Sequence, residues 1–276
     1  MSRRWPLGSL PGAILFSLAL APLSWGGPRS ENERGGEELR KPVVGERLGF
    51  HGRWLAIPVG YGWLEVKELV TIDGRSAYHI EVQGHSNDVL SAFYPIHDVI
   101  HSYLDVDTLR PLRFEKHQRE GRYRADEVVT FDYTRRIAVY HSLLNQSTKE
   151  IQIPEDTQDL ISALYWFRAQ PLRPNTTLQL NLYTDEKIYQ TAIQIEEPRR
   201  IELLKRGTFL CVAVEPKAAF KGLFINRGRL LAYLTVDQYQ LPLLVSVTTP
   251  WGPMSAVIDE ASMPESLKRT RHKVFP

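Results

Sequence analysis

The chain has little cysteine and no surplus of charge, and both shortages exclude classes of function. Cys211 is the only cysteine in 276 residues, so it cannot form an internal disulfide or belong to a multi-thiol metal site. It lies in the apolar run GTFLCVAVEP, which favours a buried core residue, with a reactive thiol as the alternative. The chain has 34 basic and 32 acidic residues. Without a basic surplus to neutralise phosphates, its charge does not support nucleic-acid binding.

The chain is also poor in long apolar runs, and the run at its amino terminus is short. Basic MSRRW precedes an uncharged stretch from Ala13 to Leu23, and Ser24 and Gly26 have the small-x-small spacing of a cleavage site. This layout is typical of a secretory signal peptide. An uncleaved anchor is the alternative, although the stretch is shorter than the ~20 residues that span a membrane. We therefore expect residues 1–26 to be a cleaved signal peptide.

Composition divides the rest of the chain into three parts. Residues 27–42 are rich in glycine, proline and charge and have no apolar periodicity, which indicates a flexible leader. Residues 43–264 carry the apolar patterns of one β-rich domain. Residues 265–276 form a basic end that we expect to be a solvated tail.

The body of the chain shows repeated β-type alternation. Apolar side chains alternate in WLEVKELVTI and AYHIEV, with Glu68 as the exception, and Asp73-Gly74 between them is a hairpin signal. We interpret Gly60-Tyr61-Gly62 as a turn between strands. Short strands at even spacing predict a mainly β protein, in which a curved antiparallel sheet forms an open or closed barrel, with a sandwich as the alternative.

One segment breaks the β pattern. Capping residues in DTQD precede LISALYWFRAQ, and Pro171 ends the run, so we predict a helix over residues 157–170. The helix is apolar on most sides, which is typical of a buried helix. We expect it to act as a plug or lid inside the curled sheet; packing on one face of a sandwich is the alternative. Its candidate ligand contacts are Leu160, Leu164, Trp166 and Phe167.

No motif in the sequence predicts catalysis. His97 and His101 would share one face of a helix, but the zinc-hydrolase motif needs glutamate beside the first histidine and a third ligand. On a strand they lie too far apart to bind one ion, and only His79, His85 or His117 could assist. There is no Gly-x-Ser-x-Gly nucleophile elbow. We therefore predict a non-enzymatic protein with no cofactor and no metal.

A basic stretch from residue 110 to 124 is a second candidate site. Its arginines alternate with aromatic side chains and could bind an anionic headgroup, and we take Arg113, Arg119 and Arg122 as candidate surface contacts. The alternative is a solvated hairpin in which arginines pair with carboxylates across strands.

In its order of motifs the chain resembles the exported bacterial proteins known as domain of unknown function 3108. The resemblance rests on WLAIPVGYGWLEV, the DGRSAYHIEV hairpin, the DLISALYWFR helix, the GTFLCVAVEP strand and LLAYLTVDQYQLPLLVSV. It implies a periplasmic envelope protein with a curved antiparallel sheet around a helix, similar to the open barrels of lipoprotein carriers. It implies no catalytic residue.

Two functions are compatible with these patterns. The first is a carrier or sensor that binds an apolar ligand or lipid inside the curled sheet, because a concave apolar interior is the usual small-molecule site. The second is an envelope scaffold with a filled core that binds another protein. A cavity of roughly 300 Å³ or more beneath the helix would favour the carrier.

The amino-terminal layout predicts that the exported protein starts at or near Gly27. Signal peptidase would cut after the small-x-small pair and release a chain without residues 1–26. Intact-mass analysis of the exported form checks this, and a mass that still includes residues 1–20 would contradict it.

Overall fold

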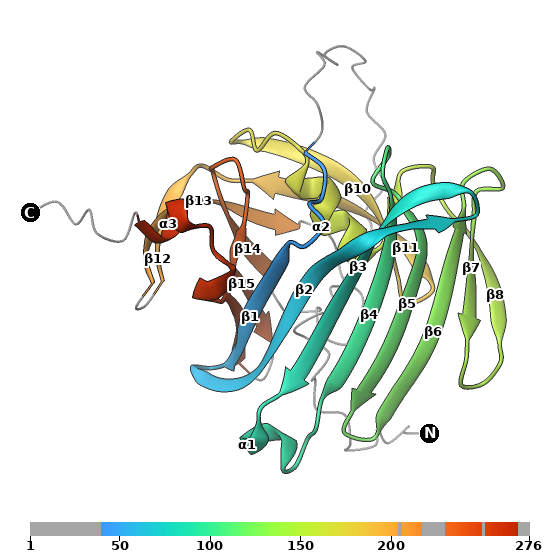
Figure 1. The fold of residues 1–276 in the computed structure, drawn as a ribbon, viewed down its shortest axis with the longest axis horizontal. Helices are drawn as coiled ribbons and strands as arrows, with labels where there is room; N and C mark the ends of the chain where they lie inside the picture. Colours follow the sequence, from blue (N-terminus) through green and yellow to red (C-terminus); the bar gives the residue numbers. More distant parts are fainter. Residues whose placement is uncertain (1–39, 204–205, 217–229, 250–251, 270–276) are drawn as a thin grey trace, which may run out of the picture.

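A computed structural model describes residues 40–203, 206–216, 230–249 and 252–269. Its main feature is a single sheet of 16 strands that curls around helix α2 (Figure 1). The expected signal peptide and most of the expected leader lie outside the described residues.

The strands follow one another through the sheet largely in chain order, from β8 at one edge through β1 and β16 to β9 at the other. Neighbouring strands are antiparallel except β9 and β10, which are parallel. The first eight strands are β1 (Arg47–Trp54), β2 (Ile57–Ile72), β3 (Arg75–Ser86), β4 (His97–Asp105), β5 (Pro111–Glu120), β6 (Tyr123–Asp132), β7 (Ile137–Ser142) and β8 (Thr148–Gln152).

The second half of the sheet comes after Pro154 and completes the curve. Its strands are β9 (Thr157–Gln158), β10 (Thr176–Thr184), β11 (Lys187–Ile195), β12 (Arg199–Leu203), β13 (Gly207–Pro216), β14 (Leu230–Thr235), β15 (Pro242–Thr249) and β16 (Gly252–Ile258). The helices are α1 (Asp88–Ser91), α2 (Leu160–Arg168), the 3₁₀ turn η2 (Glu260–Ser262) and α3 (Glu265–Arg269).

The expected mainly β fold is confirmed, and so is the hairpin between β2 and β3. Asp73 and Gly74 have φ of 48° and 78°, the positive values that a type I′ turn requires. A bulge between Val66 and Glu68 places Glu68 opposite His79, which explains why this glutamate breaks the apolar alternation.

The turn expected at residues 60–62 is wrong, because these residues lie within β2. Gly60 pairs with Ser86, and a Cβ on Gly60 would lie 2.2 Å from the carbonyl oxygen of His85. This glycine therefore permits a close approach of β2 and β3 and does not mark a turn.

Among the described strands, no ladder joins the edge strands β8 and β9, and side chains bring the two ends of the sheet together instead. The ring of Phe131 on β6 contacts that of Tyr183 on β10 edge to face, with centroids 5.5 Å apart. Nearby, Lys149 on β8 forms a 3.1 Å ion pair with Glu186 in the turn between β10 and β11. The result is an open barrel whose two edge regions are in contact.

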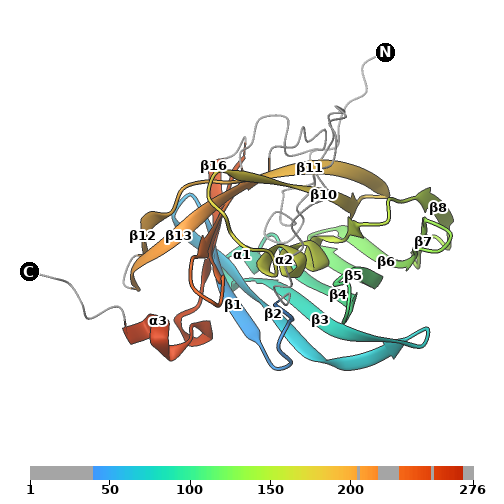
Figure 2. The same cartoon turned by 90° about the horizontal axis from the view of Figure 1, so that it is seen from above.

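Helix α2 lies between the two layers of the curled sheet, as Figure 2 shows from above. One side of the helix contributes Ile161 and Tyr165 to the first core cluster, which comes mainly from β2–β7. Another side contributes Phe167 to the second cluster, which comes from β10, β11, β13 and β14. A helix that contacts both halves of an open sheet buries inner-face area that the sheet alone leaves accessible to water.

The helix begins later than its predicted start at residue 157. Thr157 and Gln158 form β9, and Asp159 is the residue that caps the helix. A capping box explains the shift, because the Asp159 carboxylate accepts from the Ser162 backbone N–H while the Ser162 hydroxyl accepts from Asp159 N–H.

The carboxyl-terminal part of the body packs against β1. The expected tail begins as helix α3, and Leu267 contacts the third core cluster, which includes Leu48 and the expected core residue Cys211. Cys211 is fully buried, and burial raises the pKa of its thiol to about 12. The thiol is therefore protonated and packs as a core side chain, as expected. Residues 270–276 lie outside the described part.

We expect Ile161→Ala to destabilise the protein by about 2–5 kcal/mol, because it removes a buried side chain between the helix and the first cluster. Leu164→Ala is the matched control on the same helix. Leu164 is only partly buried, so its truncation should cost less. Chemical denaturation measures both free energies of unfolding, and equal costs would contradict this arrangement of the helix.

Candidate functional site at helix α2

The four candidate ligand contacts on α2 differ in exposure. Phe167 is 5% exposed and belongs to the second core cluster. Leu160, Leu164 and Trp166 pack against the clusters but keep part of their surface accessible, and Leu160 contacts both clusters. Phe167 therefore has a structural role, whereas the other three side chains keep some apolar surface accessible.

The start of α2 is anchored to β4 by a buried carboxylate. Asp159 accepts hydrogen bonds from the hydroxyl of Ser102 at 2.6 Å and from the backbone N–H of Ile161 at 2.7 Å. Asp159 is 1% exposed, and burial raises the pKa of its carboxyl to about 6 although these hydrogen bonds favour the charged form. This contact fixes the helix on the inner face of β4.

The end of α2 is anchored to the segment before β1 by an ion pair in which Arg168 is buried and Glu46 is partly buried. The guanidinium of Arg168 donates to both carboxylate oxygens of Glu46, through Nη1 at 2.8 Å and Nη2 at 2.7 Å. The hydroxyl of Tyr165 also donates to Glu46, at 3.0 Å, and Arg168 Nη2 donates to the carbonyl of Tyr239. These contacts connect the helix to the segment just before β1 and to the loop between β14 and β15.

Each member of the ion pair stabilises the charged form of the other. Burial alone would raise the pKa of Glu46, but the hydrogen bonds and charge of Arg168 outweigh it and hold that pKa below its usual value. Burial alone would lower the pKa of Arg168, but the hydrogen bonds and charge of Glu46 outweigh it and raise that pKa above its usual value. The pair is therefore ionised at neutral pH.

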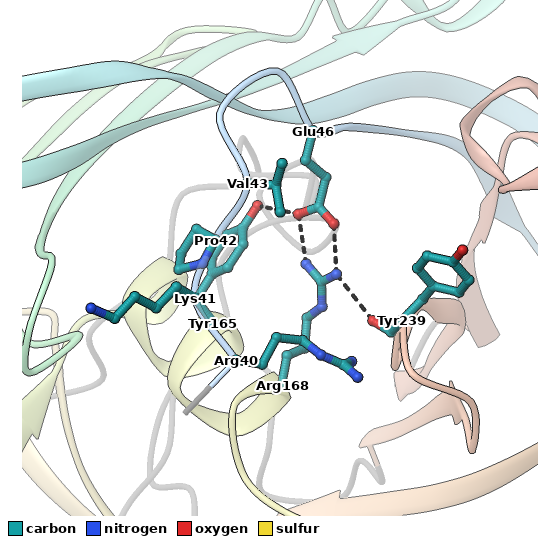
Figure 3. Close-up of a pocket in the computed structure, with 8 residues that line it drawn as sticks. All are labelled: Arg40, Lys41, Pro42, Val43, Glu46, Tyr165, Arg168 and Tyr239. Atoms are coloured by element: carbon teal, nitrogen blue, oxygen red, sulfur yellow. Dashed lines mark hydrogen bonds and ion pairs between the residues drawn. The ribbon is translucent and has the colours of Figure 1, made fainter. Parts of the chain in front are cut away.

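A pocket of about 180 Å³ lies beside this ion pair. Figure 3 shows it between the segment 40–46, the last turn of α2 and the loop that carries Tyr239. Its lining includes the cations Arg40, Lys41 and Arg168. The sequence does not predict this site, because Glu46 and Arg168 are 122 residues apart and a single charge in either segment carries no signal of its partner.

The inner face of the sheet becomes polar away from the helix. On β4 and β5, Ile100 and Phe114 belong to the first cluster, whereas Asp98, Gln118 and Glu120 are buried further along the same strands. Gln118 donates to Glu120 at 3.1 Å, and Asp98 accepts from the backbone N–H of Arg119 at 2.9 Å. The interior is therefore apolar beside α2 and polar toward α1.

The histidines considered as metal ligands lie on the face of β3–β5 opposite the first cluster. His97 and His101 are in a strand, and each contacts a histidine of β3: His101 lies 3.0 Å from His79 between ring nitrogens, and His97 lies against His85 edge to face. Burial and the charge of His79 lower the pKa of His101. Within the described ranges, no group of three or more potential ligands is arranged for a metal ion.

Two of the three candidate arginines, Arg113 and Arg119, have carboxylate neighbours on that same outer face. Arg113 forms a 2.7 Å ion pair with Glu115, and Arg119 donates to both oxygens of Asp126 at 2.8 Å. Arg122 is exposed in the turn between β5 and β6. The arrangement of Arg119 and Asp126 is a cross-strand pair, which reduces the positive charge that this face offers to an anion.

The fold and site define a class of protein, an open barrel-like β-sheet with a helix inside it. The chain belongs to the family described as protein of unknown function (DUF3108), whose model matches residues 50–259. No curated protein sequence matches the chain. Among the described residues no helix has the length and apolar character needed to cross a bilayer.

A solved structure confirms the fold class. The chain is similar to the β-barrel-like protein of domain of unknown function DUF1849 from Brucella abortus, with a TM-score of 0.51 and 8% sequence identity. The similarity covers 77% of this chain and 94% of that one. At this identity the likeness concerns the fold alone.

We expect Glu46→Gln to destabilise the protein by about 3–5 kcal/mol at pH 7, because it leaves the Arg168 guanidinium buried without a counter-charge. The Glu46 pKa is lower in the folded state, so its stabilisation is complete above the unfolded pKa and is lost as pH falls through the folded pKa. The difference between wild type and variant should therefore shrink in acid.

Urea unfolding of both proteins between neutral and strongly acidic pH measures this difference. Arg47→Gln is the control, because the Arg47–Glu65 pair is more exposed and its loss should cost about 0–1 kcal/mol. A Glu46→Gln effect as small as that of the control would mean that the ion pair does not anchor the helix.

Proposed function

We propose that this protein is an exported, non-enzymatic carrier or sensor of the periplasm that binds an apolar ligand or lipid inside its curled sheet. The observation that carries the proposal is the position of α2. It lies between the two layers of an open sheet and keeps accessible apolar surface at Leu160, Leu164 and Trp166. Apolar surface of this kind in a concave site is the usual contact for a small apolar molecule.

The two ends of the interior suggest the kind of ligand. An apolar chain would contact α2 and the side chains of the first and second clusters, whereas a polar group would suit the end with Asp98, Gln118 and Glu120. A lipid combines both chemistries. The open side between β8 and the β9–β10 end of the sheet supports entry, because side chains there can separate without breaking a strand ladder.

A scaffold that binds an envelope protein is the second candidate. It is favoured by the burial of Ile161, Tyr165 and Phe167, which already contact the core from two sides of the helix. The pocket beside Arg168 is smaller than the roughly 300 Å³ expected for a whole ligand, so it does not decide between the two functions.

We expect protein purified under native conditions, without detergent, to carry an apolar molecule. Native mass spectrometry should show an added mass that disappears on denaturation, and organic extraction should identify it. Trp166→Ala should lower the occupied fraction several-fold, because it removes accessible apolar contact area beside the second cluster.

Arg113→Ala and Arg119→Ala are the matched controls, because these side chains alternate with the cluster residue Phe114 and face away from the interior. Both should retain the occupancy of the wild type, and thermal unfolding verifies that all variants fold. A native protein that is empty, and stays empty with phospholipids and fatty acids, would overturn the carrier and favour the scaffold.

A further inference from the structure

We propose that the pocket between Arg40 and Arg168 binds a singly charged oxyanion, a carboxylate or a phosphodiester. This site is independent of the apolar surface of α2, so it can exist whether or not the sheet binds a lipid. Unpaired donors, repulsion between two guanidinium groups and the size of the pocket support this ligand class.

Two guanidinium groups at this site carry buried N–H donors that have no hydrogen-bond acceptor. Arg168 is 6% exposed and uses Nη1 and Nη2 for Glu46 and Tyr239, but its Nε is buried with no hydrogen-bond partner. The Nη1 of Arg40 is also buried and has no hydrogen-bond partner. Because a buried N–H without an acceptor is costly, these atoms favour a group that supplies oxygen lone pairs.

Repulsion between the two guanidinium groups favours an anion in this pocket. Arg40, Lys41 and Arg168 line the pocket with Glu46, and Asp237 also acts on Arg40. Lys41 forms a 4.0 Å ion pair with Asp107, which does not line the pocket, so Arg40 and Arg168 are the cations left to face a ligand there. Burial and the neighbouring charge of Arg168 lower the pKa of Arg40, so an anion here would relieve an existing repulsion.

A cation would find a poorer site in the same place. The carboxylate of Glu46 already accepts from both terminal nitrogens of Arg168 and from the hydroxyl of Tyr165. The carboxylate of Asp237 accepts from the backbone N–H of Tyr239 at 2.8 Å and from the hydroxyl of Thr235 at 2.9 Å. Both carboxylates are therefore engaged, whereas the guanidinium donors are not.

The size of the pocket limits the ligand to a small group. Its volume of about 180 Å³ is below the roughly 300–1,000 Å³ of sites that enclose a drug-sized ligand. It exceeds the roughly 30 Å³ share of one water molecule in the liquid. A carboxylate or a phosphodiester fits this range, either as a free small anion or as the headgroup of an amphiphile.

The test follows the Nε–H resonance of Arg168 in the full exported chain by ¹H–¹⁵N NMR, in buffer with little chloride. Acetate and dimethyl phosphate are the free anions, and laurate against dodecanol tests an amphiphile with and without its charge. We expect a saturable shift with the anions and none with dodecanol. Tighter binding of laurate than acetate would identify an amphiphile headgroup; equal affinity would identify a small free anion.

Arg40→Gln should weaken anion binding roughly tenfold or more, because it removes one charge-assisted hydrogen bond. Arg53→Gln, which removes an exposed arginine on β1 outside the pocket, should leave the affinity unchanged. Lys41→Gln is a second pocket variant if Arg40→Gln does not fold. The absence of a saturable shift, or equal affinity in wild type and both pocket variants, would overturn the site.

The experiments distinguish a failure of the anion-site proposal from a failure of the carrier proposal. An empty protein in native mass spectrometry with a saturable acetate shift would retain the anion site and reject the lipid. A bound lipid with no response of Arg168 to any anion would do the reverse.

Discussion

An open curved sheet has an inner face that its own strands cannot bury, and the fold depends on how this face is covered. Helix α2 provides the cover by contacting one cluster that comes mainly from β2–β7 and another from β10, β11, β13 and β14. Contact between Phe131 and Tyr183 joins the two ends of the sheet. Because the hydrophobic gain scales with apolar area removed from water, the helix and this contact together allow the sheet to remain open without exposing its core.

The position of the helix is set by polar contacts at both of its ends. Asp159 connects its start to Ser102 on β4, and Arg168 connects its end to Glu46 before β1. Apolar contacts alone are not directional and would allow the helix to slide or rotate, whereas a buried carboxylate must keep its partners. The same contacts leave the pocket with an excess of donors, so the structural anchor and the proposed anion site share Arg168.

Membership of the family and the barrel-like neighbour establish the fold but not the activity. A fold hosts many functions, so function must be argued from the site. The proposed amphipathic ligand rests on the accessible apolar surface of α2 and the polar end of the interior, and the proposed anion rests on the unpaired guanidinium donors.

Local patterns in the sequence determined the strands, the Asp73-Gly74 turn, the burial of Cys211 and the presence of one apolar helix, because each depends on neighbouring residues. The start of the helix was missed by three residues, since the choice between Asp156 and Asp159 as cap depends on Ser162 and on β9. Only the tertiary structure decided that Glu46 meets Arg168, that His79 meets His101, and that Gly60 lies within a strand. These contacts join segments far apart in the chain, and no local periodicity encodes which distant partner a charge or ring will meet.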